Sequence, residues 1–557
     1  MKEYSFIDMH IHTKFSDEEL CDMSIEQLLE KAEDYAITLG NDCVISISDH
    51  NTILGAKKAK QILVENPEKY PHVKLINGIE FTTDLTELKD HLDGENTFTR
   101  CHTLMYGYDE NNKELIAYSK VAHKHFSLDD NIGLQIMSAR RAVCEQYKIK
   151  IPFSTYLGMA DLPRAARYKQ EFVNITSEYL KKHGLPARRE DIEKLVEPYI
   201  DNKVSYNQTS SSFGKLRLSE IAQLAKESHG KLVIAHPALI NTKVSSVKKL
   251  ATKHGKEHDD IFFEHSKNNF VPLESLKDKK FVFEHFLDAY EKVCGFKIYG
   301  IEKFYTANMK SRLDKDIDEI CKQRNYFQTV GSDYHGEHLN PDRELGCFLN
   351  KKIISIYYDR FPGGGPSRNP IVISAIASAQ DLLGESVPGK QSALIKGIDG
   401  SVIPEKEFDS IIDKYHQKQR YRVENKAIFV KYDILTKINE INNIIKRLNL
   451  VANEINSSDK KIRMFNKISY SCVSVVKGLD EFKELVKVNP KTRYGYNYRL
   501  LCKTLNQAKS AFEKVLISDP EIIKNVKKTY RIQAPMLFIE RMAQIKLPAP
   551  LDVDKEK

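Results

Sequence analysis

The chain has 557 residues, of which 41% are hydrophobic and 29% charged, a composition typical of globular proteins with more than one domain. No apolar run approaches the roughly 20 residues that a membrane-spanning helix needs, and the start, MKEYSFIDMHIH, has no long apolar stretch, so we expect neither a membrane segment nor a secretion signal. The nine cysteines contain no CxxC pair, which favours free thiols and a cytoplasmic location over disulfides or a cysteine metal site.

The net charge of +8 is unevenly distributed. Residues 401–557 hold 31 Lys and Arg against 19 Asp and Glu, a balance of +12, so the remaining residues carry 8 − 12 = −4. A basic C-terminal part could meet an acidic partner such as nucleic acid. The alternative is a lysine-rich helical surface that faces only water.

The first 350 or so residues alternate short apolar runs with amphipathic stretches. Because strand–helix alternation is typical of a mostly parallel sheet, and about seven strands are expected, the pattern favours an α/β barrel over an open sheet. The expected strands are 4–12, 43–48, 73–81, 101–108, 231–236, 296–305 and 326–332.

Three further features divide the chain. Residues 111–219 are polar and largely helical in pattern, which indicates an insertion between two strands. The run FPGGGPSRNP at 361–370 is a strong breaker, and almost everything beyond Glu405 has a helical pattern. We therefore predict a barrel domain at 1–360, a linker at 361–404 and a basic helical domain at 405–557.

The first predicted strand contains the motif DMHIHT. Side chains of a strand alternate between its faces, so Asp8, His10 and His12 share one face and the apolar residues between them share the other. A single pair of this kind is weak evidence, because most such histidines are surface or hydrogen-bonded residues. The pattern repeats, however, since the later strands begin or end with residues of metal-ligating type: His50, Glu80, His102, His236, Asp333 and His335.

Strand ends of a parallel β/α barrel converge on one mouth, where active sites lie. Imidazole and carboxylate groups are ligands that suit zinc, manganese and iron. The sequence therefore predicts a metal site built from strand ends.

The motifs HIH, HTKFSD, SDHN, GIEF, AHPA and GSDYH, in this order, resemble those of the PHP (polymerase and histidinol phosphatase) family over about residues 1–350. The resemblance implies a distorted (β/α)7 TIM-like barrel and two or three divalent ions, Mn, Zn or Fe. It implies these metal ligands: His10, His12, Asp17, His50, Glu80, His102, His236, Asp333 and His335.

The resemblance also implies the reaction, hydrolysis of a phosphate ester by metal-activated water. Its catalytic residues would be His10, His12, Asp17, His50, Glu80, Asp333 and His335. The aspartate at position 17 resembles the nucleotide- and oligonucleotide-phosphatase branch of the family more than the histidinol-phosphatase branch. Asp8 and Glu302 are candidates for accepting the second ring proton of a ligating histidine.

Substrate contacts are expected from the insertion, because loops above a barrel mouth carry specificity. Arg140 and Arg141 are the candidates, since a guanidinium matches phosphate oxygens with a bidentate fork. Their alternative role is in surface ion pairs. His338, three residues after His335, could approach substrate or be an exposed loop residue.

Residues 434–455 show an a/d heptad pattern typical of a coiled coil. Its apolar stripe could be covered by helices of the same chain, at 482–488 or 500–516, by a second copy, or by a partner protein. Basic residues and Tyr494, Tyr496 and Tyr498 surround it and could hold nucleic acid. The stripe consists of Ile434, Ile438, Ile441, Ile445, Leu448, Ala452 and Ile455.

We therefore expect a nuclease or nucleotide phosphatase. One alternative is a small-metabolite phosphomonoesterase, which would have no need of a basic helical extension. The other is a non-catalytic scaffold, against which the complete set of ligand-type residues argues.

Overall fold

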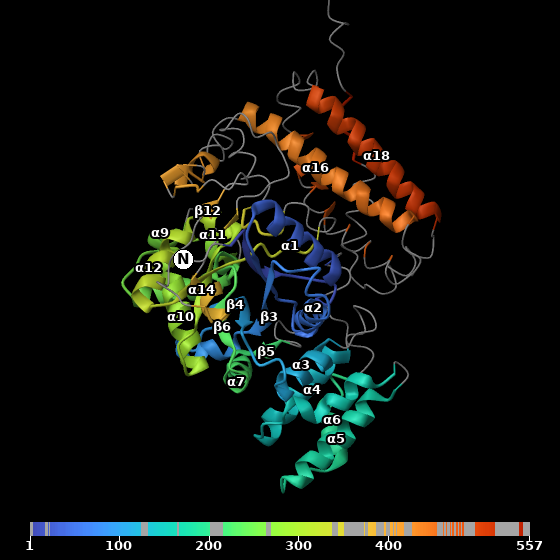
Figure 1. Cartoon of the computed structure of the whole chain (residues 1–557), viewed down its shortest axis with the longest axis vertical. Helices are drawn as coiled ribbons and strands as arrows, with labels where there is room; N and C mark the ends of the chain where they lie inside the picture. Colours follow the sequence, from blue (N-terminus) through green and yellow to red (C-terminus); the bar gives the residue numbers. More distant parts are fainter. Residues whose placement is uncertain are drawn as a thin grey trace, which may run out of the picture. The chain divides into compact units, whose positions relative to one another are not determined.

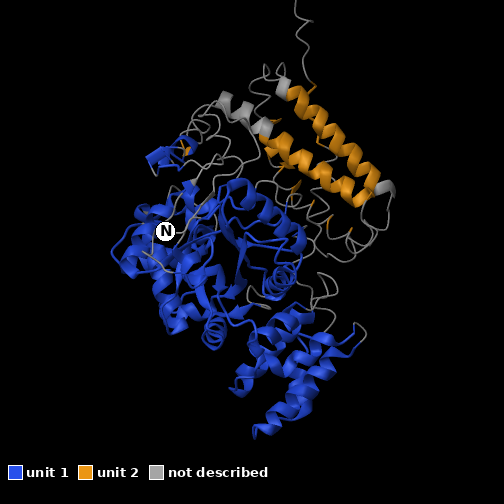
Figure 2. Cartoon of the chain, in the orientation of Figure 1, with its two compact units in different colours: residues 1–415 blue, residues 416–557 orange. Residues whose placement is uncertain are grey.

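A computed structural model describes residues 4–16, 21, 23–123, 132–163, 166–185, 187–200, 215–262, 269–336 and 343–349. Beyond these it describes 402–404, 412–416, 426–453, 496–518, 545–549 and short stretches or single residues between 372 and 483. They fall into two compact units, residues 1–415 and 416–557, which Figure 2 shows in different colours. None of the described helices is long and apolar enough to cross a bilayer.

The first unit is built on a ten-stranded sheet. Its main strand order is β1-β2-β3-β4-β6-β9-β10, and three short strands pair at its margins. Strands β1, β2, β9 and β10 are buried at every position, as expected for strands covered on both faces. The main strands are β1 (Ile7–Ile11), β2 (Cys43–Ile47), β3 (Val73–Asp84), β4 (Phe98–Tyr106), β6 (Lys231–Ile234), β9 (Gly300–Phe304) and β10 (Phe327–Val330); the marginal ones are β5 (Leu216–Arg217), β7 (Asn241–Lys243) and β8 (Phe270–Pro272).

Helices pack on this sheet and extend from it (Figure 1). The helix α1 begins with a capping box, in which the Ser24 side chain and Gln27 satisfy each other's backbone N–H groups, and it ends at Gly40 in the left-handed conformation, as the sequence predicts. The bounds are α1 (Ile25–Leu39), α2 (Leu54–Glu65), α7 (Leu218–Ser228), α8 (Val244–Lys253), α9 (His258–Ile261), α10 (Lys279–Cys294), α11 (Thr306–Ser311), α12 (Leu313–Arg324) and α14 (Ala377–Leu382).

Strand β4 departs from the predicted alternation of parallel strands, because it is antiparallel to both β3 and β6. The connection from β3 to β4 contains only the short 3-10 helix η1 (Thr86–His91), and such a connection suits an antiparallel pair, whereas a parallel pair needs a longer crossover. Since β4 runs the other way, its first half lies at the edge where its neighbours end. His102 therefore pairs with Thr82 at that edge.

A closed (β/α)7 barrel is not confirmed. β1 and β10 are the two ends of the strand order, and the described residues show one bridge near them, between Ile11 and Tyr334. Two backbone hydrogen bonds join the same segments, His12 N–H to Tyr334 O at 2.9 Å and Asp333 N–H to His10 O at 2.8 Å. The ends of the sheet thus meet just after the carboxyl end of β10.

The predicted helical insertion follows β4. Its helices contact one another and share the largest hydrophobic cluster with β3 and β4. Tyr118 packs on Phe81 of β3, with ring centroids 5.8 Å apart. The helices are α3 (Lys113–Ala122), α4 (Ile132–Tyr147), η2 (Phe153–Asp161), α5 (Tyr168–Lys182) and α6 (Arg189–Val196).

The second unit contains α16 (Lys426–Asn453) and α18 (Tyr496–Ser518), which pack in one hydrophobic cluster. The predicted stripe residues Ile438, Ile441 and Leu448 are buried, but so are Ile444 and Val451, so the covered face is wider than an a/d seam. Within the described residues the stripe is covered by the same chain, as in the hairpin alternative. Of the other predicted positions, Ile455 lies outside the described residues.

Candidate metal centre

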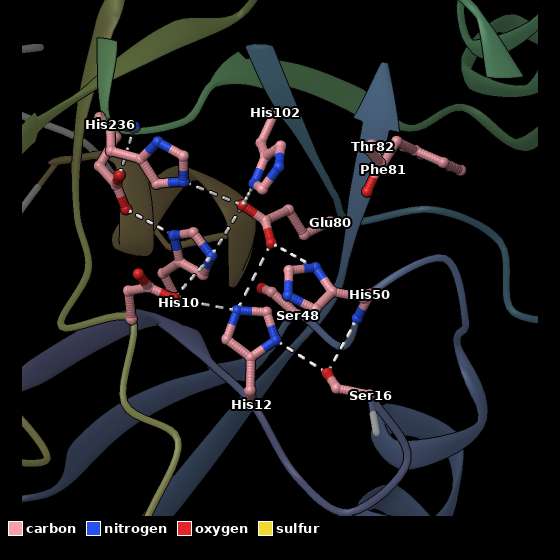
Figure 3. A network of polar contacts seen from close by, with 12 residues as sticks. His10, His12, Ser16, Ser48, His50, Glu80, Phe81, Thr82, His102 and His236 are labelled. Atoms are coloured by element: carbon pink, nitrogen blue, oxygen red, sulfur yellow. Dashed lines mark hydrogen bonds and ion pairs between the residues drawn. The ribbon is translucent and has the colours of Figure 1, made fainter. Parts of the chain in front are cut away.

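Eight of the nine predicted ligands converge at one edge of the sheet. His10 lies in β1 and His12 directly after it, while Ile7 and Met9 pack into a hydrophobic cluster on the other face of the strand. This confirms the alternation expected from DMHIHT. Figure 3 shows the part of this centre formed by His10, His12, His50, Glu80, His102 and His236.

The carboxylate of Glu80 is at the middle of the group and is shielded from solvent. Five imidazole nitrogens, carried by four strands or strand ends, lie within 3.5 Å of its two oxygens, since His10 and His12 both come from β1 or its end. The distances are 2.7 Å to His50 Nδ1, 2.9 Å to His102 Nδ1, 3.2 Å to His10 Nε2 and to His236 Nε2, and 3.5 Å to His12 Nε2.

A second carboxylate, that of Asp333, lies directly after β10 and close to three histidines. Its Oδ1 lies 3.2 Å from His12 Nε2, 3.5 Å from His335 Nδ1 and 3.9 Å from His10 Nε2. Four sets of three ligand atoms, several of which share members, lie within 4.8 Å of one another. The sets are His12, His50, His335; His10, Glu80, His236; His10, His12, Asp333; and His50, Glu80, His102.

Several of these ligand atoms have no hydrogen-bond partner within the described residues. This observation tests whether a cation fits the centre. Buried His10 Nε2, His12 Nε2, His50 Nδ1 and Glu80 Oε2 make no hydrogen bond within the described part of the chain. A buried polar atom left in this way costs about 1–3 kcal/mol. Lone pairs of imidazole and carboxylate aimed at common points are what Zn, Mn and Fe ions bind, so the donor set fits divalent metals.

The ionisation of the two carboxylates suits this role. Burial alone would raise the pKa of Glu80, but the histidines around it, with His102 foremost, hold that pKa well below its usual range. Burial is likewise outweighed at Asp333, whose pKa is lowered by Arg343 and His335. Both groups are therefore anionic at neutral pH.

A second layer of hydrogen bonds orients the ligands. Glu302 accepts a hydrogen bond from His10 Nδ1 at 2.9 Å and another from the backbone N–H of His236 at 2.6 Å. Glu302 thus accepts a hydrogen bond from a ring N–H as expected, while the role of His10 as a ligand stays a prediction. Among the described residues, no imidazole donates to Asp8. Its carboxylate accepts hydrogen bonds from Ser332 Oγ and from the backbone N–H groups of His10, Ser332 and Gly346, so that it joins β1 to the segment after β10.

The backbone at the centre is strained. His236 has φ of 26°, Asp333 has φ of 52° and Asn51, next to His50, has φ of 56°. Non-glycine residues in this region cost about 1–3 kcal/mol each and persist where surrounding contacts impose them. The three positions lie where a strand must turn sharply to aim a ligand.

The motifs did not point to Arg343 or Tyr305. Arg343 donates to Ser332 O at 2.6 Å, and its Nη1 lies 3.3 Å from Asp333 Oδ2. Tyr305 OH donates to the same Oδ2 at 3.3 Å. Asp333 is therefore held on one oxygen by a cation and a phenol, while its other oxygen faces the histidines. Neither residue belongs to a short motif, so only the three-dimensional arrangement finds them.

The predicted substrate arginines lie elsewhere. Arg140 is buried, donates to Ile151 O at 2.7 Å and pairs with Glu220 at 2.5 Å, while Arg141 pairs with Asp84 at 2.8 Å. Both line a cavity of about 500 Å³ between α4 and α7, whose lining contains no member of the metal centre. Ion pairing was the alternative role for these arginines, and contact with substrate stays a prediction.

The insertion approaches the centre through α3 instead. Tyr118 OH donates to Asn51 Oδ1 at 3.0 Å, beside His50, and the ring of His123 lies 6.4 Å from that of Phe15 in the turn after His12. The predicted ligand Asp17 and the predicted contact His338 lie outside the described residues.

No protein-family model matches this chain, and no curated protein matches it either. One solved structure, from Bifidobacterium adolescentis and provisionally named a metal-dependent phosphoesterase, aligns with 18% identity and a TM-score of 0.30. The alignment covers 62% of this chain and 92% of that one. A TM-score this low supports no argument, so membership of the PHP family stays a prediction and function must be inferred from the geometry.

Glu80→Gln should weaken metal binding, because it removes the charge that the five imidazoles and the ions share. We expect the chain to bind Mn²⁺ or Zn²⁺ with a rise in thermal midpoint, and the variant to lose that rise and most bound metal, measured by elemental analysis. Glu33→Gln is the matched control, since Glu33 also pairs with a histidine, His72, at 2.6 Å but outside the centre. Equal metal content in wild type and Glu80→Gln would remove Glu80 from the site.

Arg140→Ala should destabilise the fold without changing metal affinity. It leaves Glu220 largely buried and without its main partner, which costs about 3 kcal/mol. Arg188→Ala, which breaks a solvent-exposed pair with Asp191, should cost less than about 1 kcal/mol. The measurement is thermal unfolding with and without metal. If Arg140→Ala instead kept full stability and raised KM, Arg140 would be a substrate contact.

Proposed function

We propose that this chain is a metal-dependent phosphoesterase and that the centre around Glu80 is its active site. The observation that carries the proposal is the set of buried, unpartnered imidazole and carboxylate atoms at the edge of the sheet. His10, Glu80 and His236 would hold one ion, His12, His50 and His335 another, and Asp333 lies against His10 and His12.

Divalent ions bound there would lower the pKa of a water molecule and offset negative charge on phosphoryl oxygens. The side chains of the centre supply the charge and the orientation of the ligands. Two ionised carboxylates fix the charge of the centre, and Glu302 accepts a hydrogen bond from His10 Nδ1–H, so that the Nε2 lone pair faces inward. Arg343, beside Asp333, adds a positive charge at the margin.

The finer proposal is that the substrate is nucleic acid or a nucleotide. Its support is the +12 balance of residues 401–557 and the exposure of Lys446, Lys503 and Lys514 on α16 and α18. Tyr498 does not take part, because it is buried and its OH donates to Pro548 O at 2.7 Å. A small phosphate ester is the competing substrate, and a scaffold without turnover is the competing role.

Replacement of both His10 and His12 by Ala should abolish hydrolysis while the chain stays folded, because each of the two proposed ions loses a ligand. The assay measures release of nitrophenol from a mono- and a diester of nitrophenyl phosphate with Mn²⁺, and circular dichroism reports the fold. His254→Ala is the control, because the His254 ring contacts His285 and belongs to none of the four ligand sets. Wild-type turnover in the double variant would exclude this active site.

The triple change of Lys446, Lys503 and Lys514 to Gln should weaken oligonucleotide binding and leave hydrolysis of the small ester intact. Each lost phosphate contact should reduce the slope of log K against log salt by about 0.7 for a single strand. A triple change of the exposed residues Lys120, Lys181 and Lys182 in the first unit is the control. If binding and its salt dependence do not change, the basic charge of the helices is not a nucleic-acid surface.

A further inference from the structure

The hydroxyl of Ser16 lies in the turn after β1 and contacts three groups. It is 2.8 Å from His12 Nδ1, 2.9 Å from the backbone N of His50 and 2.8 Å from Asp49 Oδ1. The first two contacts are drawn in Figure 3. One small side chain therefore touches two candidate ligands that come from different strands.

The protons of these contacts can be counted. A serine hydroxyl has one proton and can accept two hydrogen bonds. The backbone N–H of His50 can only donate, so it uses one acceptor position of Ser16. The carboxylate of Asp49 can only accept, so it accepts the hydrogen bond that the Ser16 hydroxyl donates. His12 Nδ1 must then be the donor to the remaining lone pair of Ser16.

This assignment decides which ring nitrogen of His12 is free. A neutral imidazole has one proton, and here it is on Nδ1, so Nε2 presents a lone pair. That Nε2 is the buried atom without a hydrogen-bond partner, and it faces Asp333 Oδ1 at 3.2 Å and Glu80 Oε2 at 3.5 Å. A lone pair that faces two carboxylate oxygens needs a cation between them.

Asp49 is itself fixed in place. It accepts from the backbone N–H of Thr13 at 2.7 Å and from Thr13 Oγ1 at 2.9 and 3.0 Å. The first turn of α2 approaches it so closely that a Cβ on Gly55 would lie 1.9 Å from Asp49 Oδ2. The absence of a side chain at Gly55 therefore leaves room for this carboxylate.

We propose that Ser16 and Asp49 are positioning residues, which hold His12 in its Nδ1-protonated form and anchor the backbone of His50, so that both present lone pairs to one metal ion. The proposal rests on the proposed function in that it requires a metal centre. It goes beyond the ligand set, because neither residue need touch the ion.

The test is the affinity of the full chain for Co²⁺, followed by the visible absorption of the bound ion. Ser16→Ala should raise the Kd about 10–100-fold, as expected when a partner of a ligating histidine is lost. Ser16→Thr keeps the hydroxyl and should restore the affinity. Gly55→Ala, which displaces Asp49 and leaves Ser16 unchanged, should weaken Co²⁺ binding in the same direction.

Ser228→Ala is the matched control, because it removes a buried hydroxyl that donates to Leu224 O at 2.7 Å away from the centre. Nitrogen-15 spectra of histidine-labelled protein should show the Nδ1–H form of His12 in the wild type and its loss in Ser16→Ala. Unchanged Co²⁺ affinity in Ser16→Ala, or equal weakening in Ser16→Ala and Ser16→Thr, overturns the positioning role alone. A wild-type chain that binds no Co²⁺ overturns the proposed function, and this role with it.

Discussion

The burial of the Glu80 carboxylate is the constraint on which the centre depends. A carboxylate removed from water is costly unless it is paired, and here five imidazoles from four strands or strand ends surround it. Their nitrogens come within 2.7 to 3.5 Å of the Glu80 oxygens only because strand order, strand direction and the turn after each strand bring them to one edge of the sheet. The arrangement of β1, β2, β3, β4 and β6 at this edge of the sheet is therefore tied to one charged group.

Neighbouring contacts are also needed to hold the buried groups in place. Glu302 orients His10, and two groups hold the outer oxygen of Asp333. The left-handed backbone at His236 and Asp333 adds strain that these contacts must offset. Buried polar atoms without a hydrogen-bond partner, together with strained turns, are typical of a binding site. A purely structural core would pair such atoms within the chain.

The ligand-type residues could be predicted because two patterns are visible in the sequence. Alternation in DMHIHT places His10 and His12 on one face, and apolar runs predict where the other strands end. The reversed direction of β4 could not be predicted, because it depends on whether residues 85–97 cross over the sheet or turn back, and their composition permits both. The partners of Asp8 were also hidden, since Ser332 and Gly346 are remote from it in sequence, and no motif marks Arg343 as the partner of Asp333.

Charge patterns were less informative than spacing. From the sequence alone, Arg140 and Arg141 fit a role as phosphate ligands and a role in ion pairs equally well. Only the positions of Glu220 and Asp84 distinguish these two roles. Tyr498 has the same ambiguity, because an aromatic residue beside lysines can stack on a base or fill a helical core. In each case a distant residue decides the role.

Two backbone hydrogen bonds join His10 and His12 to the segment after β10, and this pairing has a consequence for the synthesis of the protein. Ligands from β1 leave the ribosome first, and Asp333 and His335 leave it only after the whole insertion and the other six strands of the main sheet order have been made. Pairing of such remote segments is slow compared with local folding. Until then His10 and His12 face an incomplete partner set, so the centre is completed late, and any ion captured earlier is held by fewer ligands than in the finished protein.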